Sequence, residues 1–420
     1  MISRLGTLLT VATIVAFAVP NLVSAQGSPP TITDRGATNS FPDGMRFAVA
    51  VESDSAIEEI KLRYEILPDG TAAIGRPEFA PAASVVTELD LGGAALHLPP
   101  GTVIEYHWEA TDADGDEARS ETQSFFYDDV RFQWTPIESN GVTIYYYSGS
   151  DGDAQEMSAV ATETIESMSQ LLGATIDFPV KVWIYKNNDD MRPALAPRSD
   201  TYEASVITAG VRVATDTVLV LGNASFSTLR HELTHVVTAA AGESALGTMP
   251  AWLDEGTAVF GQQDPEGFEG AVEQAINRGN VFTLRQITSS PGDPSAVNLF
   301  YGQSWSVVKY LNDAYGPEKF AQLFAEIKSG KRIDVALEAV YGFDQDGLDN
   351  EWRAAHGLDP LERVEPTDPA ATGGPARPQG EPQTEDGGGT SAVVIIAVAA
   401  GFVVLASAVG VAGWTVARRL

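Results

Sequence analysis

The chain has 420 residues, no cysteine, and 57 acidic against 26 basic residues, for a formal net charge of −31. Without cysteine it can form neither disulfides nor thiolate metal sites, so histidine and carboxylate are the side chains left to hold a metal. The strong negative charge argues against nucleic acid as a partner, because phosphate would be repelled. This length exceeds what one core usually organises and predicts two folded domains with accessory segments.

Residues 1–25 have the features of a secretory signal peptide. The basic residue Arg4 precedes an apolar run over 8–19, and small residues at 23–25 suit a cleavage site. We therefore expect the mature chain to begin near Gln26.

Residues 26–129 are predicted to form an all-β sandwich, because short β-like segments alternate with Gly, Pro and Asp turns. The expected strands are 46–51, 57–66, 84–91, 103–110 and 119–127. The segment 99–116 resembles the closing hairpin of fibronectin type III and related immunoglobulin-like modules. That resemblance implies a module of this type, with a possible surface ligand of its own.

In residues 130–362 the predicted elements change from strands to helices. Strands are expected at 142–147, 180–185 and 211–221, with an amphipathic helix at 154–172. Further helical patterns follow at 225–240, 250–261, 267–278, 301–314, 317–328 and 346–356. Strands first and helices afterwards predict an α+β domain.

The C-terminal part predicts a membrane anchor. Residues 363–391 are rich in Pro, Gly and acids and are expected to form a disordered stalk. Residues 392–416 carry no charge and are long enough for a transmembrane helix. The arginines in 417–420 predict a cytoplasmic tail, which leaves the preceding chain outside the cell membrane. The alternatives are a buried helix, or removal of the segment by a sorting enzyme.

His231 and His235 stand four residues apart with Glu232 between them. On a helix this spacing places both imidazoles on one face, one turn apart, where a single Zn²⁺ can reach both. Glu232 is rotated by about 100° from His231, so it lies beside the metal and can take a proton from zinc-activated water. The alternative is a surface helix with two solvated histidines.

Glu255 follows twenty residues after the second histidine, in an apolar segment with Pro250 at its start. Proline is favoured in the first turn of a helix, so a second helix is expected here. Such a helix would place Trp252, Glu255 and Val259 along one face, with the apolar pair seated against the first helix.

These two motifs together resemble the gluzincin superfamily, and most closely its peptidase MA-like domain. The matching residues are His-Glu-Leu-Thr-His at 231–235 and Pro-Ala-Trp-Leu-Asp-Glu-Gly at 250–256. The resemblance implies a thermolysin-like zincin fold and one Zn²⁺ per chain, held by His231, His235 and Glu255. It also implies that Glu232 is the general base.

The chain departs from the thermolysin branch of that superfamily at one place. That branch has an aspartate four residues after the glutamate ligand, where this chain has Val259. Support for the imidazoles must then come from elsewhere, and Asp254 is a candidate.

Two further similarities concern catalysis and substrate. Gluzincins of this type often carry a tyrosine-led helix after the glutamate helix, and Tyr301 begins such a pattern here. Its hydroxyl could stabilise an oxyanion, or the ring could simply pack against the helices. The strand at 211–221 resembles the edge strand along which gluzincins align extended substrates.

The sequence as a whole predicts a zinc-dependent peptidase at the outer cell surface, acting on peptides or proteins and anchored by its C-terminal helix. The alternative is a cell-surface binding or adhesion protein in which the sandwich binds a partner and the metallo-domain is an inactive scaffold. The intact Glu232 favours the enzyme, because an inactivated site would be free to lose its base.

Overall fold

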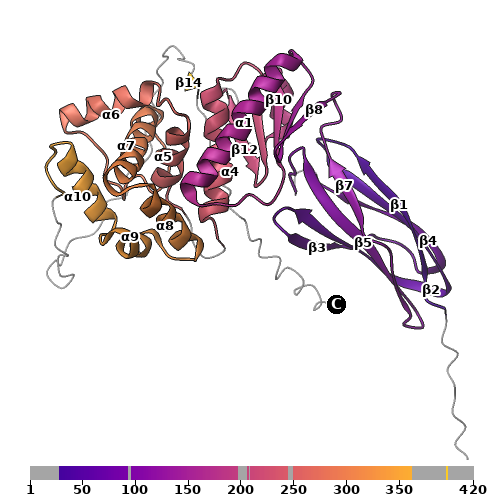
Figure 1. Cartoon of the computed structure of the whole chain (residues 1–420). Coiled ribbons are helices and arrows are strands. Elements are labelled where there is room, and N and C mark those ends of the chain that lie inside the picture. Colours follow the sequence, from indigo (N-terminus) through magenta and orange to yellow (C-terminus); the bar gives the residue numbers. More distant parts are fainter. Residues whose placement is uncertain are drawn as a thin grey trace, which may run out of the picture.

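A computed structural model describes residues 28–92, 96–196, 206–207, 209–244, 249–361 and 394–395. The chain runs from an all-β region through a five-stranded mixed sheet to a group of packed helices (Figure 1). The predicted signal peptide, stalk and cytoplasmic tail lie outside the described residues.

The N-terminal region consists of strands, as predicted. They are β1 (Thr31–Asn39), β2 (Met45–Leu67), β3 (Thr71–Gly75), β4 (Ala82–Leu91), β5 (Thr102–Asp112), β6 (Glu117–Arg119) and β7 (Gln123–Tyr127). The first half of β2 pairs with β1 and β4, and its second half pairs with β3 and β5. Side chains alternate in burial along β5, so that Ile104, Tyr106 and Trp108 face the core. That this region is a fibronectin or immunoglobulin type of module stays a prediction.

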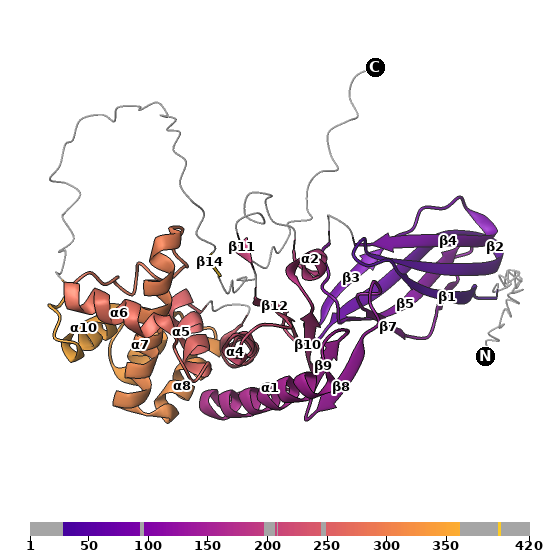
Figure 2. The same cartoon turned by 90° about the horizontal axis from the view of Figure 1, so that it is seen from above.

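The central sheet has the strand order β12-β13-β10-β9-β8. Its members are β8 (Thr135–Ser139), β9 (Val142–Tyr146), β10 (Val180–Tyr185), β12 (Gly210–Ala214) and β13 (Thr217–Leu221). β9, β10 and β13 are parallel, and the two outer strands are antiparallel to their neighbours. Helix α1 (Asp151–Leu172) connects β9 to β10 and lies with a later helix, α4 (Phe226–Gly242), on one side of the sheet (Figure 2). A short helix α2 (Asn188–Met191) and a 3₁₀ turn η2 (Arg192–Ala194) follow β10.

The strand expected over 211–221 is instead the hairpin of β12 and β13. The chain reverses at Thr215 and Asp216, and the two strands pair antiparallel. Asp216 is buried, where it forms an ion pair with Lys181 of β10 and accepts a hydrogen bond from the Thr217 hydroxyl. Aspartate favours turns, but the β-branched residues around Asp216 gave a continuous strand pattern that masked this signal. The cation that pairs with the buried Asp216, Lys181, lies far away in the sequence and could not be anticipated from the local pattern. Among the described strands, β12 therefore lies at the edge of the sheet.

Helices dominate after residue 225, as predicted. They are α4 (Phe226–Gly242), α5 (Ala251–Gly261), α6 (Gly267–Arg278), α7 (Val297–Tyr315), α8 (Pro317–Lys328), α9 (Ile333–Tyr341) and α10 (Gln345–Ala355), with a 3₁₀ turn η3 (Pro294–Ala296) before α7. α7 begins earlier than the expected residue 301, and α9 was not predicted. α9 is short, and its first turn alternates the β-branched Ile333 and Val335 with Asp334, so its pattern did not distinguish a helix from a strand.

The prediction of a transmembrane helix over 392–416 is wrong. No helix among the described residues is long and apolar enough to cross a membrane. Of the predicted span the structure describes Val394–Ile395, which form β14, a strand parallel to β11 (Val206–Ile207); the rest lies outside the described residues. β-branched residues suit a strand as well as a membrane helix, so the uncharged run did not determine a helix. The membrane partner and the anchored cell-surface location, which depended on that helix, are corrected with it.

The central sheet is buried on both faces. Aliphatic side chains of β10 join the core formed with α1 and α4. On the other face Trp183 and Tyr185 belong to the same buried cluster as the core of the N-terminal region. The Trp183 ring stacks on Tyr145 with centroids 4.3 Å apart and meets Trp134 edge-on at 4.8 Å. The sequence segments on either side of the predicted boundary at 129–130 therefore share one hydrophobic core.

We expect Trp183→Ala to lower the free energy of unfolding by about 3–5 kcal/mol, because it empties a fully buried ring site. Urea unfolding followed by circular dichroism measures the change. Trp183→Phe is the control. Trp183 Nε1 has no hydrogen-bond partner among the described residues, so phenylalanine loses only part of the buried ring volume and should cost less than the alanine substitution. An alanine effect as small as that of phenylalanine would contradict the shared core.

Candidate metal centre

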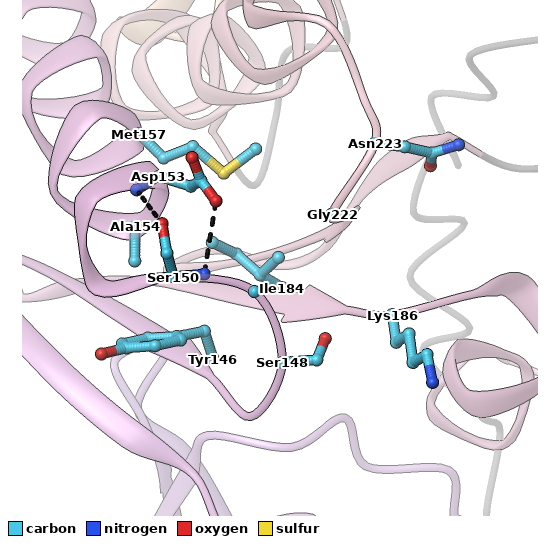
Figure 3. Close-up of a pocket in the computed structure, with 11 residues that line it drawn as sticks. Tyr146, Ser148, Ser150, Asp153, Ala154, Met157, Ile184, Lys186, Gly222 and Asn223 are labelled. Carbon is cyan, nitrogen blue, oxygen red and sulfur yellow. Dashed lines mark hydrogen bonds between the residues drawn. The ribbon is translucent and has the colours of Figure 1, made fainter.

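A cavity of about 210 Å³ lies at the start of α1, near the carboxyl ends of β9 and β10 (Figure 3). Parallel sheets often bind ligands at such ends. Two of its polar side chains are engaged in capping, since the Ser150 hydroxyl accepts the Asp153 N–H and the Asp153 carboxylate accepts the Ser150 N–H. None of the residues predicted for the metal site lines this cavity.

Helix α4 carries the two histidines on a capped, amphipathic sequence. The Ser225 hydroxyl accepts a hydrogen bond from the Thr228 N–H at the helix start. An apolar face fixes the rotation of the helix, and its buried members include Leu229, Leu233, Val236 and Val237. His231 and His235 are only 1 % and 2 % exposed. That burial excludes a surface helix with solvated histidines.

Helix α5 brings the third candidate ligand. Pro250 is the residue before its first turn and provides no side-chain cap. The N–H groups of Ala251 and Trp252 instead donate to the backbone carbonyls at 287–288, which satisfies part of the open helix end. Glu255 follows in the next turn and is 4 % exposed.

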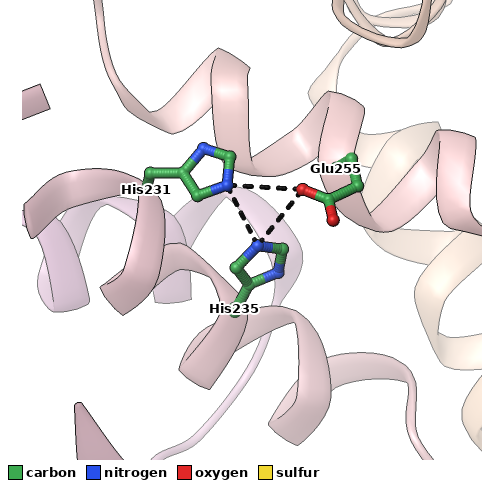
Figure 4. Close-up of side chains that lie close together, drawn as sticks. All are labelled: His231, His235 and Glu255. Carbon is green, nitrogen blue, oxygen red and sulfur yellow. Dashed lines mark hydrogen bonds and ion pairs between the residues drawn. The ribbon is translucent and has the colours of Figure 1, made fainter. Parts of the chain in front are cut away.

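The structure brings His231, His235 and Glu255 together (Figure 4). The two Nε2 atoms are 3.2 Å apart, and Glu255 Oε2 lies 3.3 Å from His231 Nε2 and 3.4 Å from His235 Nε2. A tetrahedral zinc ion with bonds of about 2.0–2.1 Å requires ligand atoms about 3.3–3.4 Å apart. Glu255 Oε2 also has no hydrogen-bond partner in the described part of the chain. These three side chains therefore fit a zinc ion.

Asp254 supports the second histidine. Its Oδ1 lies 3.0 Å from His235 Nδ1 and accepts a 2.7 Å hydrogen bond from the Thr238 hydroxyl. Burial alone would lower the pKa of His235, but the carboxylates of Asp254 and Glu255 raise it well above its usual range. Burial would conversely raise the pKa of Asp254, and His235 holds it below its usual range. The candidate named from the sequence thus contacts one of the two imidazoles.

Glu232 lies beside this group and is fully buried. Its Oε2 accepts the backbone N–H of Arg212, on β12, at 2.9 Å, and its Oε1 has no hydrogen-bond partner among the described residues. Burial raises the pKa of Glu232, and the nearby histidines oppose this effect. β12 can approach because residue 210 is glycine, where a Cβ would lie 3.0 Å from Glu232 Cγ. A buried carboxylate with one unbonded oxygen is suited to accept and return a proton.

Tyr301, on α7, lies next to the first histidine. Its ring centroid is 5.9 Å from that of His231, and its ring stacks on Phe268 of α6 with centroids 5.1 Å apart. Both expected roles, stabilising an oxyanion and packing among helices, are compatible with this position.

Gln262 contacts the site and was not predicted. It is buried, and its Nε2 lies 2.9 Å from His231 Nδ1. It stands seven positions after Glu255, which places both on one face of the helix two turns apart; this spacing was the available sequence signal. Val259, where the thermolysin branch has its aspartate, packs in the hydrophobic core instead.

Residues 160–356, just under half of the chain, match the family model described as Peptidase MA superfamily. No curated protein matches the chain. The family match supports a zincin-type peptidase, which is the class of protein that the sequence motifs resemble.

Solved structures also resemble the chain, at low similarity. An M1 zinc metallopeptidase from Deinococcus radiodurans is 12% identical with a TM-score of 0.35, covering 76% of this chain and 91% of its own. An aminopeptidase N family protein from Idiomarina loihiensis is 10% identical with a TM-score of 0.35, covering 71% and 72%. A family 56 carbohydrate-binding module, a β-1,3-glucan binding domain, is 19% identical with a TM-score of 0.15, covering 23% and 98%. At these scores none of the three supports a functional argument.

Gly261 sets how closely α4 and α5 approach. An added Cβ would lie 2.2 Å from Thr234 Oγ1, so Gly261→Ala should force the helices apart and lower the free energy of unfolding by about 1–3 kcal/mol. Chemical denaturation measures this loss. Gly270→Ala in α6 is the control, because nothing lies within 4 Å of its added Cβ, and it should stabilise by about 0.5–1 kcal/mol. Equal effects of the two substitutions would be incompatible with the close contact.

Proposed function

We propose that this chain is a zinc-dependent peptidase of the gluzincin type, in which His231, His235 and Glu255 hold one Zn²⁺ and Glu232 is the general base. The observation that carries the proposal is the triangle of ligand atoms with edges of 3.2, 3.3 and 3.4 Å. The match to the Peptidase MA superfamily supports the reaction class. The division into a β-sandwich at 26–129 and a peptidase domain at 130–362 belongs to the same proposal.

Glu232 takes a proton from the attacking water and returns it to the leaving amine. The hydrogen bond from the Arg212 N–H positions Oε2, while Oε1 carries no hydrogen bond from the described residues and is available for the proton. Because burial raises the pKa of this carboxyl group, it is a better base than an exposed glutamate. Zinc, when bound, supplies Lewis-acid chemistry by polarising a carbonyl and acidifying water.

β12 aligns the substrate as an added strand. Among the strands that the structure describes, β12 pairs with β13 alone. The Leu221 N–H donates to the Ala209 carbonyl, so alternate residues from 209 onward direct their main-chain groups toward β13. The main-chain groups of Gly210 and Arg212 then face the opposite edge, where the Arg212 N–H meets Glu232. Backbone pairing at this edge requires no particular side chain and suits peptides of varied sequence.

Glu232→Gln should retain zinc and lose hydrolysis, because the amide preserves the shape of the side chain but cannot accept the proton. We expect peptide cleavage to fall about 10²–10⁴-fold while zinc stays at the wild-type content. Cleavage of casein and of a broad peptide library, with and without chelator, measures the activity, and elemental analysis measures the metal. Glu273→Gln, an exposed position on α6, makes the same chemical change away from the site and should leave both unchanged.

The outcomes of this experiment separate the enzyme from its rival. A wild-type protein with stoichiometric zinc and no cleavage of any library peptide would favour a binding protein with an inactive metallo-domain. Cleavage that survives both the chelator and Glu232→Gln would contradict the assigned metal and base.

Tyr301→Phe distinguishes the two roles open to Tyr301. If the hydroxyl stabilises the oxyanion, kcat should fall about 10²–10³-fold with little change in zinc content or in the free energy of unfolding. Steady-state kinetics and urea unfolding provide the two readouts. Tyr310→Phe, further along α7, is the matched control and should leave kcat unchanged. An unaltered kcat in Tyr301→Phe would assign this residue to packing alone.

A further inference from the structure

The C-terminal end of α5 reaches the side of His231 that faces away from Glu255. Close packing brings it there, because Gly261 lies against Thr234, between the two histidines on α4. Gln262 follows Gly261 directly, and the backbone then turns at Gln263, which has a positive φ of 70°. The Gln262 side chain is therefore held beside the His231 imidazole by backbone geometry on both sides of it.

Hydrogen-bond chemistry indicates what this side chain does. A neutral imidazole that offers Nε2 to a metal carries its proton on Nδ1, so Nδ1 must donate to an acceptor. Gln262 lies 2.9 Å away, and in the described part of the chain His231 is the sole hydrogen-bond partner of its side chain. The amide oxygen of Gln262, Oε1, is buried and has no hydrogen-bond partner among the described residues. Rotating the amide group by 180° places this oxygen next to His231 Nδ1, where it can accept the hydrogen bond.

We propose that Gln262 is a positioning residue that holds His231 in the tautomer and orientation required to bind the metal. This inference rests on the metal centre of the proposed function. It assigns unlike partners to the two histidines, because His235 has the carboxylate of Asp254 and His231 has a neutral amide.

The choice of an amide follows from the charge already present. Glu232, Asp254 and Glu255 place three carboxylates in or beside the centre; Glu232 and Glu255 are buried and Asp254 is partly exposed. A fourth carboxylate next to His231 would add buried negative charge to the metal-free protein. An amide provides the acceptor without that charge.

Gln262→Met tests the acceptor, because methionine matches the side chain in length and presents no amide oxygen. We expect its dissociation constant for zinc to rise about 10–100-fold. Gln262→Glu restores an acceptor of similar shape and should bind zinc at least as tightly as wild type, since a charged acceptor makes a stronger hydrogen bond. Gln263→Glu is the control, because it introduces the same charge one residue away at an exposed position, and it should leave affinity unchanged.

The full-length protein is stripped of metal, and zinc affinity is measured by competition with a chromogenic chelator. Imidazole ¹⁵N spectra of the zinc-loaded forms report whether His231 Nδ1 carries a hydrogen-bonded proton, which a merely structural role would not alter. Wild type should show this proton strongly hydrogen-bonded, and Gln262→Met should lose that signature while Gln262→Glu keeps it.

The possible failures are distinguishable. One zinc per wild-type chain with the same affinity in Gln262→Met would overturn the role of Gln262 and leave the proposed function intact. Gln262→Glu binding as weakly as Gln262→Met, with Gln263→Glu unchanged, would equally reject an acceptor role. A wild-type chain that binds no zinc would remove the metal centre and this inference together.

Discussion

The candidate metal centre depends on the close packing of α5 between two other helices. Gly261 lets α5 lie against Thr234 of α4, and a Cβ at Gly256 would lie 2.4 Å from the Ser304 carbonyl of α7. Glu255 is next to Gly256, so the two close approaches fix the height and rotation of the carboxylate relative to the histidines. The three candidate ligands are therefore positioned by helix packing, which is stiffer than a loop.

This packing encloses an excess of negative charge. The centre holds three acidic side chains, Glu232, Asp254 and Glu255. The basic groups near them are two histidines and Arg212, which is itself paired with Glu243. Buried carboxylates are costly unless paired, and here the pairing is incomplete, since Glu232 and Glu255 each keep one oxygen without a hydrogen bond from the described residues. A divalent cation would neutralise this excess, so metal binding and the stability of the α4–α5 pair should be thermodynamically coupled.

Local features of the site were predictable from the sequence, and features created by packing were not. The spacing of His231 and His235 on a helix follows from the helical repeat, and the helix carrying Glu255 follows from its apolar pattern. The spacing of Gln262 from Glu255 places both on one face of α5, but Gln262 reaches His231 only because Gly261 packs against Thr234, and that contact cannot be read from the sequence. The turn at Asp216 likewise depends on a distant cation, Lys181. The run at 392–416 was expected to form a membrane helix, whereas its two described residues, Val394 and Ile395, form a strand, which β-branched residues favour.

The N-terminal region covers one face of the central sheet, whose strand β10 is buried on both faces. All six residues of β10 are buried, so the sheet needs cover on the side opposite α1 and α4. The N-terminal region provides it, and the buried Asp129 at the junction accepts hydrogen bonds from Tyr185 and Arg131. Val211 of β12 belongs to this shared core, while the next residue, Arg212, donates its N–H to Glu232. The N-terminal region thus packs against β12, the strand proposed to align the substrate, whether or not that region binds a ligand of its own.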